Sequence, residues 1–281
     1  MARHFACLTF DFDAVSTWIA RGMTSPTPIS RGEFGVVGVR RLLELLGKYS
    51  IRATFFIPGH TIETFAEPCR EIVEAGHEVG HHGWTHLSPL NMSPEEEEKE
   101  LKRGLDAVRG LTGQPPRGYR SPVWDHSPIT VDLLVKYGFF YDSSMMADDY
   151  TPYRARSGDR IEVQTPMSFG RTTKLIEIPV SWSLDDAPHF ELVRTPNWVQ
   201  QGLMNAQGVL DNWVGDFEYM AEHAQWGALT YTCHPYCIGR GHRMRMLERL
   251  VQRLRELGAT FESMGVVADE FDKLKPYKKP S

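Results

Sequence analysis

The sequence predicts an α/β fold, a single distorted (β/α) barrel of seven or eight parallel strands. Short apolar runs alternate with helical stripes at least six times along the chain, which implies parallel strands joined by helical crossovers. Polar residues stand where the apolar runs end, as they do at the carboxyl end of such a barrel. A doubly wound open sheet would instead gather them near one switch point. The length of 281 residues fits one domain spanning residues 1–281.

The expected strands are short apolar runs. Phe5 to Phe10 is apolar apart from Thr9, which suits a strand buried on both faces of a parallel sheet. Leu175 to Trp182 and Ala228 to Cys233 are the best-marked strands later in the chain. The remaining expected strands are 51–57, 78–80, 118–120, 139–141 and 260–261, with 160–164 as a further candidate.

Helices are expected between the strands, where apolar residues recur three and four positions apart. The helix that begins at Pro94 has the clearest start, because Ser93 can cap it and Glu96 is placed for a capping box. The other expected helices are 39–49, 62–75, 129–137, 197–222, 242–257 and a C-terminal one. Residues 14–34 are expected to form a long irregular loop, because they contain several Pro and Gly residues.

Composition and charge exclude several classes of function. The net charge is −5 and no run is rich in Lys and Arg, which argues against a nucleic-acid partner. No apolar stretch is long enough to span a membrane, and no signal peptide precedes the first strand. The four cysteines lack the spacing of a structural zinc site and are expected to be reduced thiols of a cytoplasmic protein. The basic residues from about 273 onward are expected to form a short solvated tail.

Residues 77–86 contain four histidines, two of which, His82 and His86, stand four apart. Imidazoles at this spacing share one face of a helical turn, so both can bind one metal ion. His77 and His81 have the same spacing, and spacing alone does not choose between the pairs. His82 and His86 are preferred because they follow the expected strand at 78–80, at the end where a barrel keeps its site.

Asp11 and Asp13 follow the first strand and share a face of it, since they are two residues apart. One carboxylate would complete a divalent-metal site with the two histidines, and the other would accept a proton from a water. His234 follows the last well-marked strand and is a candidate general acid. Arg120 would pair with the carboxylate that does not bind metal, and Asp185 or Asp186 would orient His234.

Together these motifs resemble the polysaccharide deacetylase family, the NodB-homology domain, over nearly the whole chain. The family's Thr-Phe-Asp-Asp motif is similar to Thr9–Asp13, with Phe12 inserted between the acids. Its His-x-x-x-His, Arg-x-Pro and His-Pro motifs match residues 82–86, 120–122 and 234–235. The resemblance implies that Asp11 is the catalytic base and His234 the acid. It also implies that Asp13, His82 and His86 bind a divalent metal ion, with zinc the expected one.

The inserted Phe12 and the neighbouring loops resemble a cytoplasmic branch of this family. That branch includes the Helicobacter peptidoglycan-deacetylase homologue, cyclic imide hydrolases and allantoinase-like members. The resemblance implies a homotetramer and either a small-molecule or an N-acetylated sugar substrate. The candidate substrate-binding residues are Trp18 and Trp124, with Trp182 as a further aromatic wall, and Tyr141 and Asp142, near which a backbone N–H is expected to hold the oxyanion.

The predicted function is therefore metal-dependent hydrolysis of a non-peptide carbon–nitrogen bond, with a cyclic imide or ureide ring as the alternative substrate. A rival of another class is a catalytically silent carbohydrate- or metabolite-binding barrel that keeps a structural metal. Asp11 and His234 argue against that rival, since a structural ion needs neither. A metal-dependent isomerase or aldolase is a weaker rival, because Arg120 is the one clear cation that could bind a phosphate or enolate.

Overall fold

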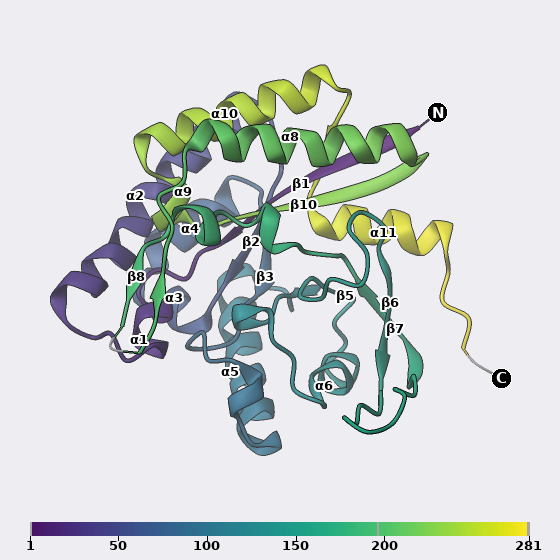
Figure 1. The fold of residues 1–281 in the computed structure, drawn as a ribbon. Helices are drawn as coiled ribbons and strands as arrows, with labels where there is room; N and C mark the ends of the chain where they lie inside the picture. The colour runs from purple at the N-terminus through teal and green to yellow at the C-terminus, as the bar shows by residue number, and fades with distance from the viewer. Residues whose placement is uncertain (1, 196, 280–281) are drawn as a thin grey trace.

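The computed structural model describes residues 2–195 and 197–279. Most of its strands form one curled sheet (Figure 1). Its strands are β1 (Arg3–Asp11), β2 (Thr54–Ile57), β3 (Glu78–His81), β4 (Gly118–Tyr119), β5 (Tyr141–Asp142), β6 (Tyr153–Ser157), β7 (Arg171–Glu177), β10 (Trp226–Cys233) and β11 (Thr260–Phe261). Their order is β10-β1-β2-β3-β4-β5-β7-β6, and β11 pairs with β1. A separate antiparallel pair joins β8 (Val193–Arg194) to β9 (Val199–Gln200).

The helices lie around this sheet (Figure 1). They are α1 (Ser16–Ala20), α2 (Pro26–Lys48), α3 (Gly59–Thr64), α4 (Ala66–Glu74), α5 (Pro94–Thr112), α6 (Thr130–Lys136), α7 (Asp186–Phe190), α8 (Ala206–His223), α9 (Pro235–Ile238), α10 (Gly241–Glu256) and α11 (Met264–Leu274). Three short 3-10 helices are η1 (Pro89–Asn91), η2 (Pro122–Trp124) and η3 (Trp182–Leu184). No helix of the described residues is both long and apolar enough to cross a bilayer.

All neighbours along the sheet from β10 to β7 are parallel, and only β6 is antiparallel to its neighbour. The predicted distorted (β/α) barrel is confirmed as a half-barrel, which the described strands leave open between β10 and β6. Because the strands are parallel, their carboxyl ends meet at one rim of the half-barrel.

The two faces of the sheet contribute to different apolar cores. Ala6, Leu8 and Phe10 of β1 belong to the larger core, with residues of α2, α8 and α10. Phe5 and Cys7 of the same strand point to the opposite face, as the period of a strand requires. On that face α11 supplies Met264, Val267, Ala268 and Phe271. The C-terminal helix therefore fills the end of the half-barrel away from the rim.

The prediction of an irregular loop at 14–34 is wrong, because α1 and the first part of α2 lie within these residues. Its glycines serve close packing within a helix. A Cβ on Gly32 would lie 2.5 Å from the Ala14 carbonyl oxygen, and one on Gly38 would lie 2.0 Å from that of Pro235. Pro26 stands at the first helical position, where its missing N–H costs nothing. Glycine and proline here permit a tightly packed helix rather than a turn.

Three other expected elements need correction, and the capping box at the start of α5 is confirmed. The helix expected at 197–222 begins at Ala206, where Asn205 caps it through the Gln207 N–H. The strand expected at 175–182 is β7, which ends at Glu177. The candidate strand at 160–164 contributes one isolated bridge, between Arg160 and Ser168. The expected basic tail follows α11, and its last residues, 280–281, lie outside the described part of the chain.

Candidate active site

Two carboxylates stand at the carboxyl end of β1. Asp11 is its last residue and Asp13 follows two positions later, and each side chain is almost fully buried. Phe12 between them is also buried, in the larger core. The Asp13 carbonyl accepts hydrogen bonds from Ser16 Oγ at 2.8 Å and from Thr61 Oγ1 at 2.6 Å. The chain is therefore fixed at this point, and both carboxylates reach the same cavity.

His82 and His86 follow β3, as expected, but they do not share a helical turn. The segment between them is a loop in which Gly83 has a φ of 70° and His86 one of 58°. These left-handed residues fold the chain back, so the two rings lie 5.0 Å apart between centroids. His82 Nε2 is 3.4 Å from Asp13 Oδ1, and His86 Nε2 is 3.4 Å from Asp13 Oδ2. The predicted convergence occurs through a different backbone conformation.

The competing histidines have structural partners. His81 Nε2 lies 2.9 Å from the Leu101 carbonyl oxygen, on the helix side of the sheet. His77 Nδ1 accepts the Ala53 backbone N–H at 3.2 Å. Burial lowers the pKa of His81 to about 4, so its ring is neutral. Neither histidine lines the cavity that contains Asp13.

The donor atoms of Asp13, His82 and His86 suit a divalent cation. They lie within 4.8 Å of one another, and all three residues are buried. Asp13 Oδ1 and His82 Nε2 have no hydrogen-bond partner among the described residues, although buried polar atoms normally do. The His82 ring is oriented by its other nitrogen, which lies 2.8 Å from the Arg120 carbonyl oxygen. Two imidazoles and one carboxylate form the ligand set of a catalytic site with an open position.

Charge and burial act in opposite directions at these ligands. Burial tends to raise the pKa of Asp13, but the charges of His86 and His82 and a hydrogen bond from His82 hold it well below its usual range. Burial lowers the pKa of His86 to about 4 despite the attraction of Asp13, and the positive charges of His82 and Arg21 add to the lowering. Burial would also lower the pKa of His82, but the charges of Asp11 and Asp13 outweigh it and raise that pKa. Metal ligands need an ionised carboxylate and neutral imidazoles, so His82 would lose its proton when an ion binds.

Arg120 forms an ion pair with Asp11, the carboxylate outside the candidate ligand set. Its guanidinium is fully buried, and Nη1 donates to Asp11 Oδ1 at 2.8 Å. The same nitrogen donates to Thr9 Oγ1, while Nε and Nη2 donate to the backbone oxygen and the hydroxyl of Ser143. Asp11 Oδ2 stays free of this pair and lies 3.8 Å from His82 Nε2. Arg120 thus orients Asp11 beside the three metal-ligand candidates.

His234 comes from the carboxyl end of β10, and its Nε2 lies 3.9 Å from Asp13 Oδ2. The sequence left open whether Asp185 or Asp186 orients His234, and the distances favour Asp186. Asp186 Oδ1 accepts from His234 Nδ1 at 2.7 Å, whereas Asp185 Oδ1 is 3.6 Å away. The Asp186 carboxylate also accepts the His234 backbone N–H.

The pKa of His234 is raised well above its usual value. Burial alone would lower it, but the negative charge of Asp185 and the hydrogen bond and charge of Asp186 outweigh that effect. Burial and the nearby charge of Asp186 raise the pKa of Asp185 to about 7, although His234 opposes this. These charges favour the imidazolium form of His234, with Nδ1 held by Asp186 and Nε2 directed toward the cavity.

The cavity that these residues share has a volume of about 440 Å³. Trp124 forms part of its wall and stacks on Trp182, with ring centroids 4.2 Å apart. Val123 and Trp124 have left-handed backbone conformations, with φ of 52° and 57°. Such a conformation is strained for a β-branched residue, and strain of this kind gathers at functional sites. The backbone turn at Val123 and Trp124 thus forms a fixed part of the cavity wall.

Three of the expected substrate-binding residues do not line this cavity. Trp18 is fully buried in the larger core. The Tyr141 hydroxyl donates to Glu78, and its backbone N–H donates to the Arg117 carbonyl oxygen, so it is not free to hold an oxyanion. Asp142 is buried next to His126, at 3.1 Å. Successive side chains of a strand point to opposite faces of the sheet. For a strand as short as β5, the sequence does not show which face borders the cavity.

Sequence reasoning also missed residues that do line the cavity. They include Thr17, Arg21, Gln200 and Tyr236. Thr17 of α1 and Arg21 at its end belong to the segment that was expected to be irregular, so nothing in the sequence indicated that they line the cavity. Gln200 comes from β9, within the range that was expected to be helical.

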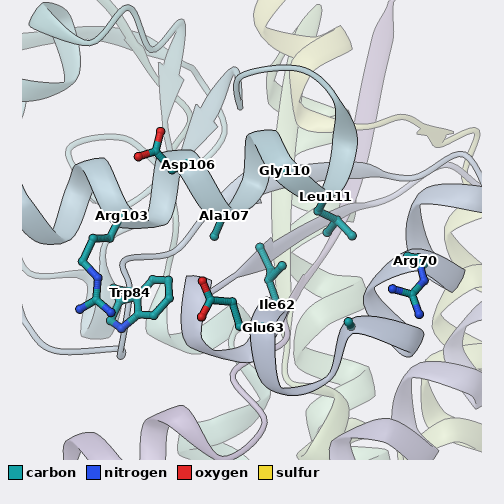
Figure 2. A pocket seen from close by; sticks show the side chains of 10 residues that line it. Ile62, Glu63, Arg70, Trp84, Arg103, Asp106, Ala107, Gly110 and Leu111 are labelled. Carbon is teal, nitrogen blue, oxygen red and sulfur yellow. The ribbon is translucent and has the colours of Figure 1, made fainter.

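A second hollow lies on the outside of the half-barrel, between α3, α4 and α5 (Figure 2). Its volume is about 560 Å³, and none of its lining residues lines the cavity with Asp13. Arg103 lies over the Trp84 ring there, 3.8 Å from its centroid. No histidine lines this groove, so the rim cavity, which contains the candidate metal ligands, is the candidate active site.

The fold is a half-barrel whose rim carries a candidate metal cluster flanked by two charge-paired side chains, an arrangement that suits a metal-dependent hydrolase. The chain belongs to the polysaccharide deacetylase family. The peptidoglycan deacetylase of Helicobacter pylori is 38% identical over 284 residues, which cover 96% of each chain. A family model described as polysaccharide deacetylase matches residues 31–141.

Solved structures agree with this assignment. A Mycobacterium smegmatis protein assigned as a polysaccharide deacetylase has a TM-score of 0.85 at 30% identity, covering 100% of this chain and 95% of that one. The allantoinase PuuE has a TM-score of 0.80 at 21% identity, covering 99% of this chain and 93% of that one, which shows likeness of fold alone. The predicted family and enzyme class are confirmed.

Proposed function

We propose that this chain is a metal-dependent hydrolase of non-peptide amide bonds in which Asp11 is the base and His234 the acid. The observation that carries the proposal is the convergence of two pairs on one cavity. The Asp11–Arg120 pair and the His234–Asp186 pair flank the cluster of Asp13, His82 and His86. A structural ion would need the cluster and neither pair.

Asp13, His82 and His86 would hold the metal, and their donor set favours zinc. When bound there, the ion would supply Lewis-acid polarisation of the amide carbonyl and a lowered pKa for a water beside it. The protein contributes the geometry of the ligands, since the Arg120 carbonyl oxygen orients His82 and the Ser16 and Thr61 hydroxyls hold the backbone at Asp13.

Asp11 is placed to accept the proton of the attacking water. Its Oδ1 is occupied by Arg120, which leaves Oδ2 as the acceptor on the side of the ligand cluster. The ion pair fixes the carboxylate with no solvent contact, so little reorganisation is needed when the proton arrives.

His234 would protonate the departing nitrogen. Asp186 occupies Nδ1, so the proton available for transfer is on Nε2, which faces Asp13 across the cavity. A negative charge at Nδ1 also stabilises the imidazolium until the nitrogen leaves. Base and acid therefore stand on two sides of the ligand cluster.

We propose the Val123 backbone N–H as the donor to the developing oxyanion, in place of the one expected near Tyr141. Val123 lines the cavity, and its N–H has no hydrogen-bond partner among the described residues. Its left-handed φ of 52° turns the chain sharply at this point of the wall. A fixed backbone donor at a strained turn is suited to a charge that appears only during the reaction.

The substrate candidates are an N-acetylated sugar and a cyclic imide or ureide. The first follows from the peptidoglycan deacetylase relative and the second from the likeness of fold to an allantoinase. A cavity of about 440 Å³ lies in the range of small-molecule sites, which favours one sugar unit or one ring over a long glycan. Cytoplasmic location and a homotetramer stay predictions.

The test is the Asp11→Asn variant, assayed on acetylated sugars, hydantoins and cyclic imides with zinc content measured in parallel. We expect turnover to fall by about 10²–10⁴-fold, as for loss of a general base, with zinc content unchanged. Full activity in the variant would remove the base assignment. Zinc binding by the unaltered protein without turnover of any amide in the panel would favour the silent binding barrel.

A further inference from the structure

Arg21 is a cation of the active-site cavity whose side chain forms no ion pair or hydrogen bond with the described residues. Arg21 lines the cavity, and its Nη1 atom is buried without a hydrogen bond to any of the described residues. No carboxylate of those residues lies within ion-pair distance of it, in contrast to Arg120 and its Asp11. Arg31 nearby donates to Glu191 and to the Leu192 carbonyl oxygen. Arg21 is therefore a half-buried charge that no described residue neutralises, and it is available to a ligand in the cavity.

A second polar group of the same cavity also lacks a hydrogen-bond partner among the described residues. Thr17 is 1% exposed, lines the cavity, and its Oγ1 has no partner among the described residues. Thr17 lies in α1 and Arg21 is the residue that ends this helix, and both side chains line the same cavity. A hydroxyl and a guanidinium left free in one cavity form a recognition site for an oxygen-bearing group.

The position of this pair is fixed relative to the metal-ligand candidates. α1 begins three residues after Asp13, and Ser16 Oγ donates to the Asp13 carbonyl oxygen at 2.8 Å. The guanidinium of Arg21 lies over the Trp18 ring, 5.3 Å from its centroid. Trp18, expected to touch substrate, supports the arginine instead. The start of α1 is thus held to Asp13, and Thr17 and Arg21 line the same cavity as the metal-ligand candidates.

We propose that Thr17 and Arg21 form a subsite for a carboxylate, so that the substrate is an amide that carries an acidic group. This rests on the proposed function, because it takes the bond cleaved near Asp13 to be an amide. A guanidinium binds a carboxylate through two parallel hydrogen bonds, which are about twice as strong as those to a neutral oxygen. The negative charge of the carboxylate would also neutralise Arg21, which no described carboxylate pairs with.

The test compares matched substrates on the zinc-loaded enzyme. N-acetylmuramic acid and hydantoin-5-acetic acid are each paired with the carboxamide made from their carboxyl group, which keeps the shape and removes the charge. We expect kcat/KM to favour the acid of at least one pair by about 10- to 100-fold, the range of charge-assisted hydrogen bonds. Arg21→Gln removes this preference and Arg21→Lys restores part of it.

Arg103→Gln is the control, because Arg103 is also stacked on a tryptophan but lies in the outer groove (Figure 2). It should keep the full preference for the acid. Thr17→Val, which is nearly isosteric, should reduce the preference by about 3- to 10-fold, and it keeps the proposal testable if Arg21→Gln does not fold. An acid preference that is absent, or that Arg21→Gln and Thr17→Val leave unchanged, overturns the proposal.

Calorimetric binding of the same four compounds separates this proposal from the proposed function. Turnover of the amides with no preference for the acid in turnover or in binding contradicts the carboxylate subsite and leaves the hydrolase in place. Preferential binding of the acids that depends on Arg21, without turnover of any amide, supports the subsite and contradicts the hydrolase.

Discussion

Replacing Asp186 with Asn tests how the structure makes His234 an acid. Asp186 Oδ1 accepts from His234 Nδ1 at 2.7 Å, and the carboxylate also accepts the His234 backbone N–H. Asn keeps the shape and one acceptor oxygen but removes the charge. A hydrogen bond to a charged group contributes about 1.5–3 kcal/mol and one between neutral groups about 0.5–1.5 kcal/mol, so the imidazolium loses roughly 1–1.5 kcal/mol. That corresponds to a fall of about one unit in the pKa of His234.

The sign of the pH effect follows from the role of the residue. The acid acts when protonated, so kcat falls as the pH rises through the pKa of His234. Burial lowers this pKa, while Asp185 and Asp186 raise it well above its usual value, and Asp186→Asn removes part of the raising effect. We expect the alkaline limb of the kcat profile to move to lower pH by about one unit.

Asp185→Asn is the matched control, because Asp185 lies 3.6 Å from the same nitrogen. Asp185 makes no hydrogen bond to His234, so its replacement removes only a charge, whereas Asp186→Asn also weakens the hydrogen bond at 2.7 Å, and the limb should shift less in Asp185→Asn. Titration of the His234 ring by nitrogen NMR in the zinc-loaded protein reports the same pKa without turnover. A larger shift in Asp185→Asn than in Asp186→Asn would refute the assignment of Asp186, and an unchanged limb in both would remove His234 as the acid.

Two further predictions concern stability and the metal site. Ser93→Ala removes the capping box at the start of α5 and should lower the free energy of unfolding in urea by about 1 kcal/mol, with turnover retained; no loss would mean that the box contributes nothing. Gly83→Ala places a Cβ at a φ of 70° and 2.9 Å from Pro122 Cγ, so it should cost about 1–3 kcal/mol of stability. It should also weaken zinc affinity in a chelator competition, because Gly83 sets the turn between His82 and His86; unchanged affinity would show that the turn does not set the ligand geometry.

Much of the fold was predictable because its signals are local. Short apolar runs between helical stripes predict parallel strands, and the residues that follow β1, β3 and β10 share one rim as a consequence. The α5 capping box depends on Ser93 and Glu96, which are three positions apart, and was predicted from them. The open edge of the half-barrel was not predictable, because the antiparallel pairing of β6 with β7 depends on contacts distant in sequence.

The errors have a common physical origin. The glycines of α2 were taken as breakers, although they allow the helix to approach Ala14 and Pro235 closely. The four-residue spacing of His82 and His86 indicated a helical turn, but left-handed residues achieve the same convergence in a loop. Tertiary packing selects these conformations, and a single sequence does not record what each residue packs against. For the same reason Trp18 was predicted to line the cavity, and Arg21 was not.

The most direct measurement is anomalous diffraction at the zinc edge from crystals grown with zinc, together with zinc content for His82→Ala and His86→Ala. We expect one strong peak within bonding distance of Asp13, His82 Nε2 and His86 Nε2, with Asp11 and His234 on two sides of it. Each histidine variant should lose most of its zinc. A peak bound by other residues, or zinc retained in full by both variants, would contradict the account.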